Sequence, residues 1–165
     1  MVDPLQDALQ SLPHGPEFRF VDRLLSLVPG QRAAGEYVVR EDAYYLRGHL
    51  PGEPLLPGVL LVEAVAQMAG IVAQNDPAFP AFEGLRLTAL RAVKILGTAR
   101  PGETVRLEAA ITGRLGHLVQ AKATASVAGL TVLSAQLTLS GQAPRPTGAP
   151  PPAAGLGKLD DGAAV

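Results

Sequence analysis

The chain has 165 residues, of which 47% are hydrophobic and 18% charged, so it can form one domain with its own core. Its 14 basic and 15 acidic residues give a formal net charge of −1, without the basic excess that is typical of nucleic-acid binding. The absence of cysteine excludes disulfides and thiolate metal sites and favours a reducing compartment. Because the first residues lack a secretory signal pattern, we expect a cytoplasmic protein.

The N-terminal part of the chain predicts a short helix followed by two strands. Asp3 and Pro4 are typical of a helix start, and apolar residues follow at helical spacing as far as Leu12. We expect residues 18–30 to form one strand and residues 32–39 to form a second. The segment 41–58 is rich in glycine and proline and is predicted to be a loop.

Residues 59–73 form an almost continuous apolar run that predicts a helix. Glu63 and Gln67 are its only side chains with strong hydrogen-bonding groups. A membrane span is disfavoured because Pro57 and Gly58 interrupt the start of the run, and because a charged group in the bilayer costs on the order of several kcal/mol. A helix that is apolar on nearly every side should therefore be enclosed by protein.

The C-terminal half predicts four more strands with turns between them. Apolar and polar residues alternate most clearly in the middle two, which is typical of antiparallel strands with one covered face. The sequence therefore predicts an α+β domain over residues 1–140, with six strands around one helix. The rest, 141–165, is rich in proline, glycine and alanine and is expected to be a disordered tail. The four predicted strands are residues 85–95, 103–112, 117–127 and 130–140.

Glu63 is the first candidate functional residue. Burial disfavours the charged form of a carboxyl group, and a protonated acid can donate its proton to a leaving group. Gln67 lies one helical turn further on, where it can hydrogen-bond Glu63 and fix its orientation. The alternative is a structural glutamate that pairs with an arginine or faces water at a subunit interface.

The second candidate is His49, because a positioned imidazole can act as a general base near neutral pH. A single loop histidine is more often structural, and we give His14 and His117 that interpretation. The start of the long helix supplies a third feature, since the amides of Gly58, Val59 and Leu60 should lack helical partners. Such amides can stabilise negative charge on a carbonyl oxygen, and Gly58 has no side chain to obstruct a thioester.

Four motifs together resemble one family. They are "LPH" at 12–14, "VDR" at 21–23, "GH-PG-P--PGVL--EA-AQ-AG" across 48–70 and "PGE" at 101–103. These resemble the 3-hydroxyacyl-acyl carrier protein dehydratases of type II fatty acid synthesis, the FabZ type. The related FabA type usually has aspartate at the position of Glu63.

The resemblance implies a hot-dog fold, in which a six-stranded curved antiparallel sheet wraps around one long helix. It also implies that His49 and Glu63 form the catalytic pair across a homodimer interface, in dimers that often assemble into hexamers. Gly58 would bind the thioester carbonyl, with Val59 and Gln67 also at the substrate site. No metal or organic cofactor, nucleic acid or membrane is implied.

The expected reaction is therefore dehydration of (3R)-3-hydroxyacyl thioesters to trans-2-enoyl thioesters. His49 would remove the α-proton, and Glu63 would protonate the departing hydroxyl. The sequence leaves open the acyl length and the choice between acyl carrier protein and coenzyme A as the carrier. Two alternatives also remain open: a hot-dog acyl thioesterase, and a non-catalytic acyl-binding or assembly subunit.

Overall fold

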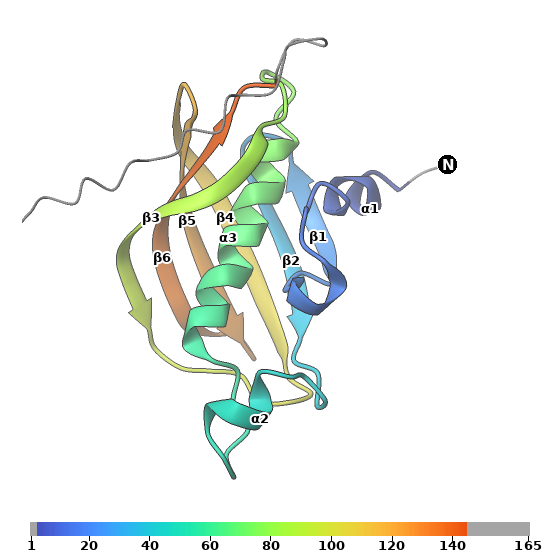
Figure 1. The fold of residues 1–165 in the computed structure, drawn as a ribbon, viewed down its shortest axis with the longest axis vertical. Coiled ribbons are helices and arrows are strands. Elements are labelled where there is room, and N and C mark those ends of the chain that lie inside the picture. Colours follow the sequence, from blue (N-terminus) through green and yellow to red (C-terminus); the bar gives the residue numbers. More distant parts are fainter. Residues whose placement is uncertain (1–2, 145–165) are drawn as a thin grey trace, which may run out of the picture.

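The computed structural model describes residues 3–144, which form one sheet and one long helix with smaller helical segments (Figure 1). The strands are all antiparallel to their neighbours, in the order β1-β2-β4-β5-β6-β3. The elements are α1 (Pro4–Leu9), a 3-10 turn η1 (Pro16–Phe18), β1 (Arg23–Val28), β2 (Arg32–Val38), α2 (Leu46–His49), α3 (Gly58–Gln74), β3 (Glu83–Ile95), β4 (Thr104–Leu115), β5 (Leu118–Val127) and β6 (Leu130–Gln142).

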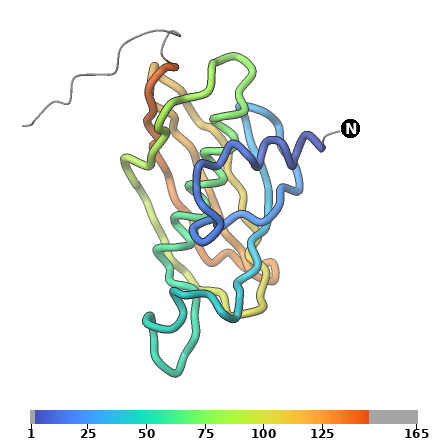
Figure 2. Tube along the Cα trace, turned by 45° about the vertical axis from the view of Figure 1, so that its right-hand side comes forward, coloured from blue at the N-terminus to red at the C-terminus, as the bar shows by residue number. Residues whose placement is uncertain are grey.

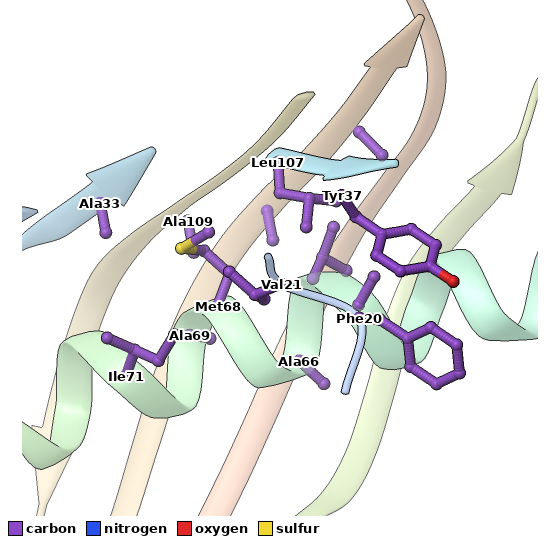
Figure 3. Packing of buried hydrophobic residues seen from close by; sticks show 14 of the residues in the cluster. Phe20, Val21, Ala33, Tyr37, Ala66, Met68, Ala69, Ile71, Leu107 and Ala109 are labelled. Atoms are coloured by element: carbon purple, nitrogen blue, oxygen red, sulfur yellow. The ribbon is translucent and has the colours of Figure 1, made fainter. Parts of the chain in front are cut away.

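The long helix α3 lies across the inner face of the curved sheet, as the sequence predicts (Figure 1). Every residue from Leu61 to Ala73 is buried except Glu63. The predicted alternation is confirmed over residues 104–110 of β4 and 119–125 of β5, where buried inward positions alternate with exposed ones. Figure 3 shows Met68 of α3 reaching toward Ala109 of β4 in this core.

The predicted first strand is wrong over its N-terminal part. Residues 16–18 form the turn η1, and β1 begins only at Arg23. The physical reason is that the Phe18 carbonyl and the Phe20 amide hydrogen-bond to the Gln67 side chain rather than to a neighbouring strand. This N-terminal segment packs along α3, as the trace in Figure 2 shows.

The predicted loop 41–58 is also only partly correct, because it contains the one-turn helix α2. The N-terminal helix is confirmed, with the Asp3 side chain accepting a hydrogen bond from the Leu5 amide.

Strand β6 extends two residues beyond the predicted domain boundary at 140. Most of the predicted tail, from residue 145 onward, lies outside the described residues. Within residues 3–144, no helix is both long and apolar enough to cross a membrane.

Gly35 in β2 lies where a methyl group has no room. A Cβ atom there would be 2.6 Å from the Arg23 carbonyl oxygen and 2.6 Å from the Met68 Cε. We expect Gly35→Ala to lower the free energy of unfolding by about 1–3 kcal/mol, because the backbone of β1 would have to move. Urea unfolding of the two proteins measures this difference.

Gly113→Ala in β4 is the matched control, since its Cβ would meet only the Gln120 side chain, at 3.6 Å. We expect its effect to stay within about 0.5 kcal/mol. Equal losses in the two variants would contradict this account of the β1–β2–α3 contact.

Candidate active site

Glu63 lies in the second turn of α3 and opens onto a cavity of about 750 Å³. The cavity lies between α3, the N-terminal segment and β3, and its lining includes Leu12, His14, Gln67 and Phe82. The Glu63 side chain is 24% exposed, whereas its neighbours along the helix are buried. The carboxyl group is therefore the one ionisable group that α3 contributes to the cavity lining.

Gln67 is 2% exposed, and its amide group makes three hydrogen bonds. The Nε2 atom donates to the Phe18 carbonyl at 2.8 Å and to Glu63 Oε1 at 3.0 Å. The Oε1 atom accepts from the Phe20 amide at 2.8 Å. Because both hydrogens of the amide are engaged, Gln67 has a single orientation here. The expected hydrogen bond from Gln67 to Glu63 is present.

His14 also lies beside Glu63, which the sequence analysis did not predict. Its Nε2 atom is 3.3 Å from Glu63 Oε1 in the same chain. Nothing in residue spacing places His14 near Glu63, because the contact depends on how the segment before β1 crosses α3. His14 does belong to the "LPH" motif, but the resemblance to the family implied no role for it.

His49 is the last residue of α2 and is exposed. Its Nδ1 lies 3.1 Å from the Leu55 carbonyl oxygen. A carbonyl can only accept, so Nδ1 carries the hydrogen in this contact and Nε2 is left as a free proton acceptor. Among the described residues no hydrogen bond or ion pair joins His49 to Glu63 within the chain.

A cluster of aromatic rings connects the segment before β1 with the residues before α2. The Phe20 ring packs edge-on against Tyr37 at 5.4 Å between centroids and lies 6.0 Å from the Tyr45 ring. The hydroxyls of Tyr37 and Tyr45 are hydrogen-bonded at 2.7 Å. Burial raises the pKa of both tyrosines above the usual value, so both hydroxyls are protonated at neutral pH. Phe20 therefore contacts both the Gln67 amide and the residues that precede α2.

The start of α3 differs in one respect from the sequence prediction. The Leu60 amide donates to the Pro57 carbonyl at 2.9 Å, so it is not free. The Gly58 and Val59 amides have no such partner among the described residues. A Cβ on Gly58 would lie 3.0 Å from two atoms of the Ile95 side chain, so the glycine also allows α3 to approach β3 closely.

The described part of the chain thus supplies a carboxyl group held by Gln67, an imidazole nitrogen on His49 without a partner, and two unpaired amides at the start of α3. A carboxyl group can deliver a proton, an imidazole can remove one, and an amide can stabilise an oxyanion. No group of three or more histidine, aspartate or glutamate side chains suited to a metal occurs among residues 3–144.

The chain is similar to proteins of one known family. The family model of the FabA-like domain matches residues 12–136. The chain is 34% identical to the 3-hydroxyacyl-[acyl-carrier-protein] dehydratase FabZ of Chloroflexus aggregans, over 81% of this chain and 92% of that protein. It is 36% identical to the FabZ of Caldanaerobacter subterraneus, over 80% of this chain and 93% of that protein.

Solved structures confirm the hot-dog fold. The dehydratase heterocomplex ApeI:P from Xenorhabdus doucetiae matches with a TM-score of 0.68 at 16% identity, over 81% of this chain and 90% of that one. Zebrafish thioesterase superfamily member 2 matches with a TM-score of 0.62 at 14% identity, over 81% and 93%. These distant likenesses show the fold alone, whereas the family model and the closer relatives decide the family. The chain belongs to the FabA-like family and, within it, to the FabZ-type 3-hydroxyacyl-[acyl-carrier-protein] dehydratases.

Proposed function

We propose that this chain dehydrates (3R)-3-hydroxyacyl thioesters of acyl carrier protein to trans-2-enoyl thioesters, as a step of type II fatty acid synthesis. The observation that carries the proposal is the Glu63 carboxyl group, held by Gln67 at a cavity of about 750 Å³. Relatives at 34–36% identity that bear the FabZ dehydratase name support it. A cavity whose lining is mostly apolar and includes an acid suits an acyl chain with a hydroxyl group near its thioester.

In the proposed reaction, His49 Nε2 removes the α-proton of the substrate. The electron pair moves onto the thioester carbonyl oxygen, where the Gly58 amide stabilises the negative charge, with the Val59 amide beside it. The enolate then forms the double bond as the C–O bond at the β-carbon breaks. Glu63 protonates the departing hydroxyl, which leaves as water, and the proton on His49 is returned through solvent. Each acid or base is worth on the order of 10²–10⁴ in rate.

We further propose that the site is completed in a homodimer, with His49 from one copy and Glu63 from the other. Strand β3 is an edge of the sheet, and an exposed apolar edge strand is a template for pairing with another chain. Four apolar side chains are exposed on or just after β3: Leu90, Val93, Ile95 and Leu96. Val59, at the start of α3, is 70% exposed and lies near this edge through the Gly58–Ile95 contact. Native mass measurement distinguishes a dimer from a hexamer built of three such dimers.

Mixing two inactive variants tests the composite site. We expect His49→Ala and Glu63→Gln each to lower kcat by about 10²–10⁴, because each removes one proton-transfer group. In a mixed dimer, one site carries both substitutions and the other carries neither. Co-refolding equal amounts should therefore restore roughly a quarter of the wild-type rate, if the subunits pair at random. Enoyl absorbance with 3-hydroxyacyl carrier-protein substrates, and a parallel arm with coenzyme A thioesters, measure the rate.

The control is each variant refolded alone. A mixture no more active than its components would show that His49 and Glu63 do not act across subunits. Release of free thiol without enoyl product from the wild-type protein would instead favour a thioesterase, and turnover on neither substrate would favour the non-catalytic subunit.

Charge on the exposed edge tests the proposed interface. We expect the double variant Leu90→Glu, Val93→Glu to shift the protein to a monomer and to lower activity at least tenfold, because like charges would face each other across paired edges. Sedimentation velocity measures the oligomeric state. Leu115→Glu is the control, since Leu115 is 80% exposed at the end of β4 and should leave the assembly unchanged. An intact dimer in the double variant would exclude β3 as the interface.

A further inference from the structure

The two oxygens of the Glu63 carboxyl group are in different environments. Oε1 accepts a hydrogen bond from Gln67 Nε2 at 3.0 Å and lies 3.3 Å from His14 Nε2. No hydrogen bond or ion pair to Oε2 is found among the described residues. A terminal carboxyl torsion is soft, so the oxygens would exchange freely without such contacts. Two nitrogens near one oxygen therefore make the group asymmetric.

The surroundings of His14 indicate which of its nitrogens carries the hydrogen. Nδ1 is buried and has no hydrogen-bond partner among the described residues. A hydrogen on Nδ1 would be buried without an acceptor, at a cost of about 1–3 kcal/mol. A hydrogen on Nε2 instead lies close to an acceptor, Glu63 Oε1. The tautomer with hydrogen on Nε2 is therefore favoured.

The backbone around His14 is held independently of Glu63. The Arg19 guanidinium donates to the carbonyl of His14 at 3.2 Å and to that of Leu12 at 3.4 Å. The Phe18 ring lies 6.2 Å from the His14 ring, and the Phe18 carbonyl accepts from Gln67. Gln67 and His14 thus belong to one connected unit, so they approach Glu63 from fixed positions.

We propose that His14 is a positioning residue for Glu63. With Gln67 it keeps Oε1 as the accepting oxygen, so that Oε2 carries the proton delivered to the departing hydroxyl. This inference rests on the proposed dehydration and assigns a role to a residue outside the predicted catalytic pair. We expect the 3.3 Å contact to tighten to a hydrogen bond when substrate fills the cavity, as catalytic contacts commonly do.

His14→Leu removes the Nε2 donor while keeping an apolar side chain of similar size. We expect kcat to fall on the order of 10- to 100-fold, because a misoriented acid misses the leaving group, with little change in KM. His14→Gln places an amide donor near the position of Nε2 and should recover most of the rate. His117→Leu is the control: it replaces the same residue type at the β4–β5 turn and should keep wild-type activity.

The Glu63→Gln background separates positioning from a direct role. If His14 acts only through the Glu63 acid, His14→Leu should cause no further loss when that acid is absent. Arg19→Leu, which releases the backbone of His14, should lower kcat in the wild-type background and not in Glu63→Gln. A His14 loss that persists in both backgrounds, or appears mainly in KM, would overturn the positioning role.

Ring ¹⁵N spectra of His14 supply a readout that does not need turnover. We expect the Nε2-protonated form in the wild type, and a change in the His14 signals on Glu63→Gln that His117 does not show. An Nδ1-protonated ring would contradict the inference. Wild-type protein without dehydratase activity would refute the proposed function, whereas an active wild type that His14→Leu leaves unchanged would refute this inference alone.

Discussion

The buried amide of Gln67 is the interaction on which the site depends. It lies in a helix whose other inward residues are apolar, and a buried polar group is tolerated there only when it is fully hydrogen-bonded. Gln67 meets this condition by bonding the Phe18 carbonyl, the Phe20 amide and Glu63. The Gln67 amide therefore attaches the N-terminal segment to α3 and also orients the Glu63 carboxyl group.

The aromatic cluster connects Gln67 with the segment that carries His49. Phe20 is bonded to Gln67 through its backbone and contacts Tyr45 through its ring. Tyr45 immediately precedes α2, the helix that ends in His49. One tyrosine hydroxyl donates to the other, and this hydrogen bond holds Tyr45 against the buried Tyr37. The segments that carry His49 and His14 are thus connected to one helix through Phe20.

Periodicity and composition predicted most of the fold but less of the site. The alternation in β4 and β5 and the apolar run of α3 depend on burial alone, which sequence patterns report directly. Residues 18–22 have the composition of a strand, yet their backbone groups bond a side chain 47 to 49 positions away. The same long-range contact brings His14 to Glu63. A local pattern does not contain such information, which is why His14 was assigned a structural role.

The cavity beside Glu63 follows from the spacing of residues on α3. Glu63, Ala66, Gln67, Gly70 and Gln74 all line it, and their separations of three or four residues place them along one face of the helix. Small side chains at positions 66 and 70 leave room along that face, while Glu63 lies near the start of the helix and Gln74 is its last residue. Eleven residues of helix span about 16 Å. An elongated, flexible and mostly apolar ligand with its polar end near Glu63 fits such a groove better than a compact one. The small side chains of Ala66 and Gly70 therefore leave the space beside the helix onto which the Glu63 carboxyl group opens.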